Sequence, residues 1–485
     1  MKTISTFVLV LCVMLNVTGA LAGANEEKIP ITTASEQAKK EFLIGQQLAD
    51  NLQVRESLKH FDNAIELDSS FASAYLDRAN NSLTAKDLFQ NLKEAMSHIK
   101  NASEGERLLI LATDAGTKGD LNKQKECLEK LVALYPDDER AHVTLGGYFF
   151  GMQDYRDAIR EYEKAIHIAD RFAPAYNILG YAYRQVQQYE KAEKTFKRYT
   201  ELLPNDPNPY DSYAELLLKM GRFDQSIDNY KKALGIDPNF TSSRIGLTMN
   251  YLYQGKNEKA AAEAEQLASS AHNDGERRQA CFVKAVVDID GGNLESALGD
   301  FDKEYAIGRN INDVLGMSGD LAAKANVLLE MGKYDDAAQT FATSVDLISH
   351  SDLSPELKKN ALFADHYNRA RIAIAKSDFH TAKTEIEEFS HAAEENKNAN
   401  QIRFAHELKG IEALAEKNYD EALSELHQAN QQDPYNLYRM ALAYKAKGDL
   451  GNANKFCKQA AEFYSLPLMN YAFMRNRASK MLAAG

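Results

Sequence analysis

The chain has 485 residues, a formal net charge of −13 at pH 7 and 44% hydrophobic residues. Hydrophobic content at this level excludes wholesale disorder. The acidic balance argues against a surface for nucleic acid or anionic membranes, because such surfaces need clustered lysine and arginine. Single globular cores stop growing well below this length, whereas a repeat array, in which each unit packs only on its neighbours, has no such limit.

The first 22 residues have the pattern of a secretory signal peptide. Lys2 supplies a positive charge, residues 4–15 form an apolar stretch too short to span a bilayer comfortably, and Ala20-Leu21-Ala22 is a small-x-small cleavage site. We expect cleavage after Ala22, export to the periplasm or the secreted space, and a polar linker over residues 23–34. A buried first helix is the alternative interpretation. No later apolar stretch approaches membrane length, so we expect no membrane span.

Five anchor residues recur every 34 residues through the middle of the chain, at relative positions 0, 3, 12, 16 and 19. Ala112 begins one set and Thr248 begins another, with three complete sets between them. The anchors of those three sets are Gly146, Phe149, Ala158, Tyr162 and Ala165, then Gly180, Tyr183, Ala192, Phe196 and Tyr199, then Ala214, Leu217, Ser226, Tyr230 and Ala233. Five consecutive units at an unbroken period indicate a repeat architecture.

The relative positions of the anchors have a physical reason. Residues three and four apart lie on one helical face, so the first two anchors belong to one helix and the last three to a second. The small residue that begins each set lets the two helices approach closely, and the aromatic residue fills the groove between them. Each set therefore predicts one helical hairpin.

These residues resemble the tetratricopeptide repeat family, and the resemblance implies an all-α superhelix of about 12 helical hairpins. Residues 35–270 fit a regular array and residues 271–465 a divergent one. In the divergent part the anchor spacing drifts from 31 residues between Gly410 and Ala441 to 45 residues between Ala325 and Ala370, which predicts longer helices or loops. We expect residues 466–485 to form a C-terminal capping helix.

Histidine and cysteine residues fit packing positions better than chemical sites. His142, His366 and His406 stand where the family often has a bulky residue near the start of the first helix, so we expect satisfied, half-buried imidazoles. After cleavage three cysteines remain, far apart in the sequence and on apolar helix faces, so we expect buried thiols and no disulfide framework. They are Cys127, Cys281 and Cys457.

Catalytic and metal-binding signatures fail on their spacing. The acidic run 288–293 lacks the glycine and the final carboxylate of a calcium loop, and its glycines fit a turn between helices. Glu388 and His391 have the spacing of a di-iron ligand pair, but such sites need a second pair and two more inward carboxylates. The sequence therefore predicts no enzyme, no cofactor and no metal site.

Stacked hairpins of this family form a superhelix whose first helices line the concave face, where peptides or partner segments lie. Aromatic and methionine side chains give adaptable apolar contact, and arginine and lysine can bind carboxylates. Tyr181 and Tyr253 occupy no anchor position, so we expect them to have no structural role. The predicted partner-binding residues are Phe150, Asn177, Tyr181, Arg184, Glu215, Lys219, Met249 and Tyr253, with Asp211 among them on the same face. The alternative is that these are ordinary surface residues.

The sequence thus favours a non-catalytic interaction scaffold of the cell envelope or secreted space, similar to bacterial extracytoplasmic tetratricopeptide repeat proteins. The expected partner is a protein or a peptide-like segment held in the concave groove, and nucleic acid is not expected. The alternatives are a soluble receptor for a peptide or small-molecule signal, and an enzyme with an unrecognised site between repeats. The sequence makes no prediction of oligomeric state.

Overall fold

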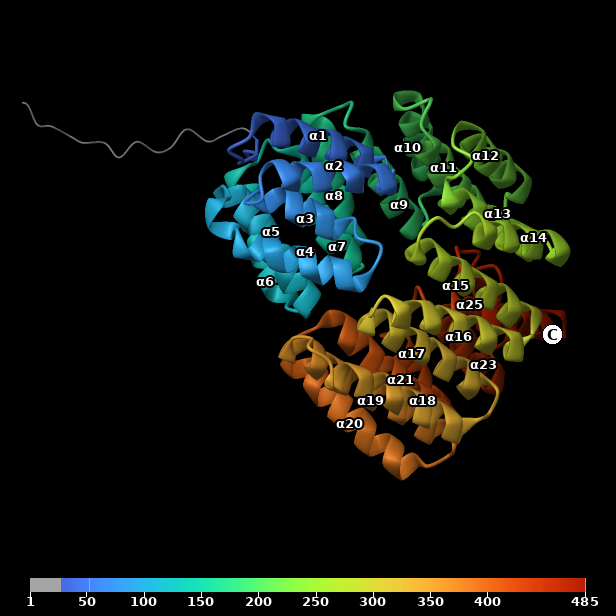
Figure 1. Ribbon diagram of the computed structural model, residues 1–485. Coiled ribbons are helices and arrows are strands. Elements are labelled where there is room, and N and C mark those ends of the chain that lie inside the picture. The colour runs from blue at the N-terminus through green and yellow to red at the C-terminus, as the bar shows by residue number, and fades with distance from the viewer. Residues whose placement is uncertain (1–27, 52, 485) are drawn as a thin grey trace, which may run out of the picture.

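The computed structural model describes residues 28–51 and 53–484, and Figure 1 shows this part of the chain as a curved stack of helices. It contains 25 α-helices, one 3-10 helix (Ile99–Asn101) and no strand within the described residues. The all-α prediction is therefore confirmed. The predicted signal peptide and residues 23–27 of the predicted linker lie outside the described residues.

Consecutive helices pair into twelve antiparallel hairpins, as the periodicity predicts. The first seven hairpins are α1 (Glu36–Asp50) with α2 (Val54–Leu67), α3 (Ala72–Asn80) with α4 (Ala85–Ser97), α5 (Glu104–Lys118) with α6 (Leu121–Leu134), α7 (Glu139–Gly151) with α8 (Tyr155–Ile168), α9 (Ala173–Gln185) with α10 (Tyr189–Leu202), α11 (Pro207–Lys219) with α12 (Phe223–Ile236), and α13 (Thr241–Tyr253) with α14 (Asn257–Ser269). These helices are mostly 13–15 residues long.

The remaining five hairpins contain the longer helices expected for the divergent part. They are α15 (Asp274–Gly291) with α16 (Leu294–Asn310), α17 (Val314–Glu330) with α18 (Tyr334–Ser349), α19 (Pro355–Ala375) with α20 (Phe379–Glu395), α21 (Ala399–Ala415) with α22 (Tyr419–Leu426), and α23 (Pro434–Ala446) with α24 (Leu450–Ala461). The last helix, α25 (Met469–Ala483), packs on α24 and also on α15, which precedes it by almost two hundred residues. The run 288–293 consists of the last turn of α15 and the two residues that link it to α16, where Gly292 has a φ of +82°.

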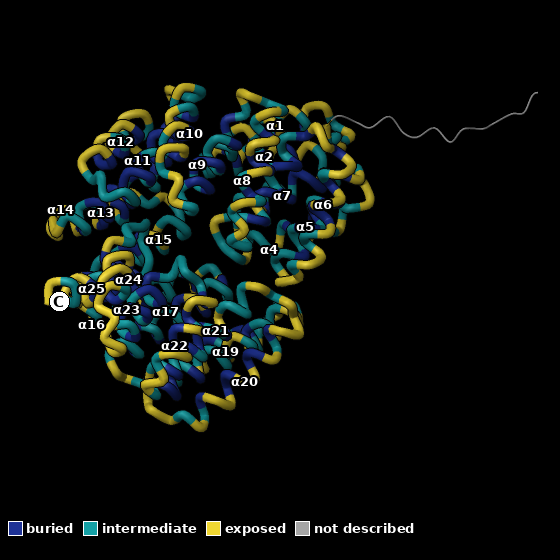
Figure 2. Tube along the Cα trace, turned by 180° about the vertical axis from the view of Figure 1, so that it is seen from behind, coloured by how far each residue is buried: buried dark blue, intermediate teal, exposed yellow. Residues whose placement is uncertain are grey.

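The core runs between the paired helices, and Figure 2 shows buried residues inside the hairpins and exposed residues at their turns and outer surfaces. The anchor residues pack as predicted. A Cβ atom on Gly146 or Gly180 would lie under 3.0 Å from the aromatic ring that faces it on the second helix of the hairpin. Those rings, on Tyr162 and Phe196, are at most 2% exposed. The absence of a side chain at these glycines therefore sets the distance between the two helices of a pair.

Three histidines at the predicted packing positions make the same contact. The Nδ1 atoms of His142, His366 and His406 each lie 2.7 Å from a glutamate oxygen 19 residues later, on the second helix of the hairpin. At His142, burial lowers the imidazole pKa, but the hydrogen bonds with Glu161 and the Pro136 carbonyl and the Glu161 charge together raise the pKa above its usual value. Burial raises the pKa of Glu161, yet its hydrogen bonds lower it to about 2. The predicted satisfied imidazoles are confirmed, and they tie paired helices together.

The stretch that precedes α1 is bound to the repeats from residue 28 onward. The Ile29 amide donates to Asp138 Oδ2 at 2.8 Å, and the Thr32 amide donates to Glu106 Oε1 at 2.9 Å. Lys28 forms an ion pair with Glu139. This part of the predicted linker therefore runs along the ends of α5 and α7 and is held there by carboxylates.

The solenoid curls back so that hairpins far apart in sequence touch. Arg55 Nη2 on α2 donates to Glu276 Oε1 on α15 at 2.5 Å, and Arg403 Nη2 on α21 donates to the Met152 carbonyl beside α7 at 2.8 Å. In Figure 1 the C-terminal helix α25 lies beside α15. The C-terminal hairpins consequently lie against the central ones.

Candidate functional site

Three of the predicted groove residues form one hydrogen-bonded cluster. Tyr181 OH on α9 donates to Glu215 Oε2 on α11 at 2.8 Å, and Arg184 Nη1 donates to Glu215 Oε1 at 2.5 Å. The Arg184 guanidinium also lies 4.7 Å from the centre of the Tyr181 ring. The periodicity therefore placed these residues on a common face, and the structure pairs them with each other.

Lys219 and Tyr253 contact the segment between α24 and α25. Lys219 Nζ donates to the Phe463 carbonyl at 2.5 Å, and Tyr253 OH donates to the Ser465 carbonyl at 2.7 Å. Met249, with its sulfur 3.7 Å from Tyr253 OH, is fully buried. The expectation that Tyr181 and Tyr253 have no structural role is wrong. Tyr181 bonds to Glu215 on the next hairpin, and the chain curls back to supply Ser465 as the partner of Tyr253.

Phe150 and Asn177 lie apart from this cluster. The Phe150 ring packs edge-on against Tyr155, with centroids 5.3 Å apart, and Asn177 Oδ1 is buried without a hydrogen-bond partner. Of the eight predicted residues, the structure thus brings Tyr181, Arg184 and Glu215 into one cluster and directs Lys219 and Tyr253 towards the C-terminal segment. Whether any of the eight contacts a partner remains a prediction.

We define the central groove as the space lined by Arg184, Glu215, Lys219 and Tyr253. Burial shifts the pKa of one group in this groove and of one group beside it. Burial raises the pKa of the nearby Asp211 carboxyl to about 7, although a hydrogen bond from Ser243 partly opposes this. Burial, followed by the neighbouring Arg184 charge, lowers the pKa of Lys219 to about 7. Both shifts reflect a site largely withdrawn from water.

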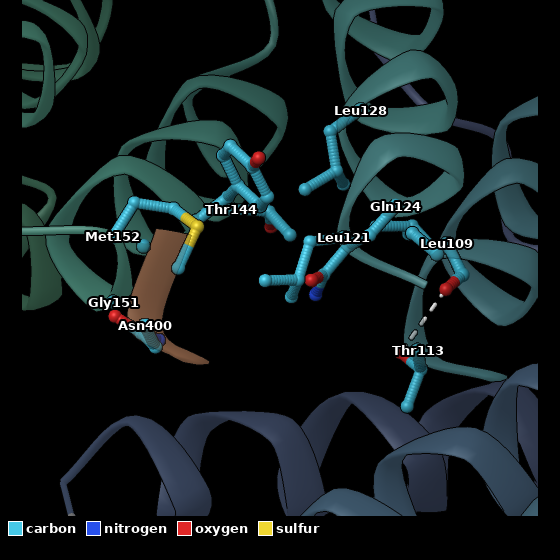
Figure 3. A pocket seen from close by; sticks show the side chains of 12 residues that line it. Leu109, Thr113, Leu121, Gln124, Leu128, Thr144, Gly151, Met152 and Asn400 are labelled. Atoms are coloured by element: carbon cyan, nitrogen blue, oxygen red, sulfur yellow. Dashed lines mark hydrogen bonds between the residues drawn. The ribbon is translucent and has the colours of Figure 1, made fainter. Parts of the chain in front are cut away.

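A second hollow, of about 350 Å³, lies between α5, α6 and α7 and opens towards α21. Figure 3 shows the side chains of α5 and α6 on one side and those of α7 on the other, with Asn400 of α21 at the rim. We call it the α5–α7 hollow. Its lining residues, none of them charged, are Leu109, Ala112, Thr113, Leu121, Gln124, Leu128, Thr144, Gly147, Tyr148, Gly151, Met152 and Asn400.

Two glycines keep the α5–α7 hollow open. A Cβ atom on Gly147 or on Gly151 would meet nothing within 4 Å, in contrast to the crowded Gly146 beside them. The hydroxyl groups of Thr113 and Thr144 already donate to carbonyls of their own helices. The hollow therefore offers apolar surface with a few neutral polar groups. Sequence reasoning missed it, although Gly147 and Gly151 are small residues outside the anchor positions, which was the available signal.

In the described part of the chain, the remaining candidate residues from the sequence do not come together in a site. Glu388 and His391 are exposed on α20. Cys127 and Cys457 are buried and Cys281 is half-buried, all as free thiols. Among residues 28–51 and 53–484, no three His, Cys, Asp or Glu side chains are grouped to hold a metal, and no helix is both long and apolar enough to cross a membrane.

Comparison with known proteins identifies the repeat. Residues 143–207 and residues 208–240 each match the tetratricopeptide repeat family. The TPR repeat-containing protein YpiA of Bacillus subtilis is 27% identical over 187 residues, which are 38% of this chain and 44% of that protein. Anaphase-promoting complex subunit 3 of Schizosaccharomyces pombe is 22% identical over 171 residues, 35% of this chain and 26% of that protein. The chain thus spans less than half the length of these relatives.

A solved structure of a tetratricopeptide repeat protein from Parabacteroides merdae is also similar. It is 15% identical in sequence and aligns with a TM-score of 0.37, over 53% of this chain and 99% of that one.

Proposed function

Because residues 143–240 are tetratricopeptide repeats and the same hairpin recurs along the described chain, we propose that this tetratricopeptide repeat protein is a non-catalytic scaffold that binds a peptide-like segment of a partner protein. Proteins of this repeat type serve as protein–protein interaction scaffolds. We place the open part of the concave surface at the α5–α7 hollow.

The observation that carries this proposal is the uncharged lining of the α5–α7 hollow beside two glycines that leave it open. Elsewhere along the groove, the chain's own residues Phe463 and Ser465 accept hydrogen bonds from the predicted partner-binding side chains. A volume of about 350 Å³ accommodates a few side chains of a bound segment. Apolar surface with neutral hydrogen-bonding groups fits an uncharged stretch of polypeptide, since burying a charge without a partner is costly.

The proposal includes export to the periplasm or the secreted space. Support comes from Lys2, the apolar residues 4–15 and the small residues Ala20 and Ala22. The acidic balance of the whole chain, a formal net charge of −13, is consistent with a long protein that stays soluble there.

A matched pair of substitutions tests the binding site. Gly147→Leu fills the α5–α7 hollow, and Gly299→Leu places the same side chain on α16, where a Cβ atom also meets nothing within 4 Å. Both replace a helical glycine by a better helix former, so neither should destabilise the fold. The native chain is used to capture partner proteins from an extract of the cells that make it. The captured amount of a partner should fall at least tenfold with Gly147→Leu and stay unchanged with Gly299→Leu. Equal capture by the two variants would refute the proposed site.

A further inference from the structure

The segment of residues 462–468 lies against the central groove. Helix α24 ends at Ala461 and α25 begins at Met469, and the seven residues between them form no helix. Two of their carbonyl groups, on Phe463 and Ser465, accept hydrogen bonds from Lys219 and Tyr253. Side chains of the groove thus bind the main chain of the segment. Such contacts do not depend on the sequence of the bound peptide.

Aromatic contacts give this arrangement its side-chain specificity. The Lys219 ammonium lies 3.6 Å from the centre of the Phe463 ring. The Tyr464 ring packs edge-on against Phe223, with centroids 5.0 Å apart, and lies 5.7 Å from Tyr253. Cation–π and aromatic pairs of this kind favour the binding of a segment with two adjacent aromatic residues.

The fit between this segment and the groove is incomplete. Ser465 Oγ and Arg184 Nε are buried without hydrogen-bond partners. A hollow of about 190 Å³ remains beside them, lined by Arg184, Glu215, Lys219 and the segment itself. Tyr464 has a φ of +28°, in a region that non-glycine residues rarely adopt. Leaving the groove would relieve this backbone strain and expose both unpaired groups to water.

Helix α25 has anchors of its own outside the segment. Tyr471 OH donates to the Ala461 carbonyl at 2.7 Å, and Arg475 Nε donates to Asp290 Oδ1 on α15 at 2.6 Å. Asn476 Nδ2 adds a hydrogen bond to the Asp290 carbonyl at 2.6 Å. These contacts lie outside residues 462–468, so they persist when the segment moves.

We propose that residues 462–468 are an internal ligand of the central groove, which a partner's segment with adjacent aromatic residues displaces. This inference rests on the proposed function, because it adds a second contact of the same scaffold with its partner. A segment tethered at both ends competes at an effective concentration in the millimolar range. The groove therefore stays closed to weak ligands and opens for a partner already held at the α5–α7 hollow.

The test adds a fluorescein-labelled peptide of residues 461–469 to the full chain and measures binding by fluorescence anisotropy. In the double variant Phe463→Ala/Tyr464→Ala the tethered competitor loses both rings, so the peptide should bind at least tenfold more tightly than to the native chain. Adding Tyr253→Phe, which removes the hydroxyl that holds the Ser465 carbonyl, should reverse part of this gain. Equal binding to the native chain and the double variant would overturn the proposal.

If the double variant melts at a lower temperature than the native chain, a change in its peptide binding could reflect lost stability. A second variant avoids this ambiguity. Pro467→Gly loosens the segment by raising its conformational freedom outside the groove and leaves the residues that contact Lys219 and Tyr253 unchanged. It should also strengthen peptide binding, by a smaller factor. Should neither variant bind the peptide while Gly147→Leu still abolishes partner capture, the internal-ligand proposal fails and the proposed function stands. Should Gly147→Leu have no effect, the proposed function fails first.

Discussion

Two neighbouring glycines on α7 predict opposite effects of the same substitution. A Cβ atom on Gly146 would lie under 3.0 Å from the Tyr162 ring, which is 2% exposed and enclosed by the hairpin. A Cβ atom on Gly147 would meet nothing within 4 Å. Replacing glycine by alanine inside a helix stabilises it by about 1 kcal/mol, and overpacking a filled core costs about 1–3 kcal/mol.

The helix-propensity gain is common to Gly146→Ala and Gly147→Ala, so the difference between them isolates the steric cost. We expect Gly147→Ala to stabilise the protein by up to about 1 kcal/mol and Gly146→Ala to be about 1–3 kcal/mol less stable than Gly147→Ala. Urea unfolding followed by circular dichroism measures the stability of both variants. Their urea midpoints are compared, because repeat arrays need not unfold in two states. If both variants are stabilised equally, the assignment of the α7 faces is wrong.

Three further predictions concern ionisation, packing and export. Because the pKa of His142 is raised in the folded state, its protonated form stabilises the fold at every pH below the pKa of histidine in the unfolded chain. This stabilisation is lost as the pH rises through the folded-state pKa. Its partner Glu161 has a pKa of about 2 in the folded protein, so the ionised carboxylate stabilises the fold at every pH above the pKa of glutamate in the unfolded chain. The urea midpoint of His142→Gln should therefore fall furthest below that of the native chain near about pH 5–6, and an unchanging gap from pH 4 to 9 would contradict this. Changing Tyr181, Arg184 and Tyr253 together to alanine should lower the free energy of unfolding by at least about 3 kcal/mol, as for a truncated buried aromatic residue; an unchanged melting temperature would show that their contacts contribute nothing. Mass spectrometry of the exported protein should find Gly23 as its first residue, and retention of Met1 would contradict export.

The hairpins were predictable because their signal is local. Small residues such as Gly146 and aromatic residues such as Tyr162 recur at fixed spacing, and helical geometry converts that spacing into shared faces. The His142–Glu161 contact follows the same logic, since the repeat brings residues 19 apart together. Each of these contacts forms within one hairpin, so the pattern of one repeat unit contains it.

The occupied groove was not predictable, because it depends on the curvature of the whole array. Tyr253 and Ser465 are 212 residues apart, and small rotations at every hairpin add up before they meet. The repeat pattern singled out Tyr253 as a residue outside the anchor positions but contained no signal for its partner. The α5–α7 hollow was missed for a related reason, since it requires Gly147, Leu121 and the distant Asn400 to converge.

Photo-crosslinking from the α5–α7 hollow tests directly whether a partner's segment binds there. A photoreactive phenylalanine analogue in place of Gly147 in the full chain, activated in the cells that make the protein, reports what occupies the hollow. We expect a crosslink to a peptide segment of another protein, with the same group at Gly299 giving little product. Crosslinks confined to this chain, or equal yields from the two positions, would contradict this expectation.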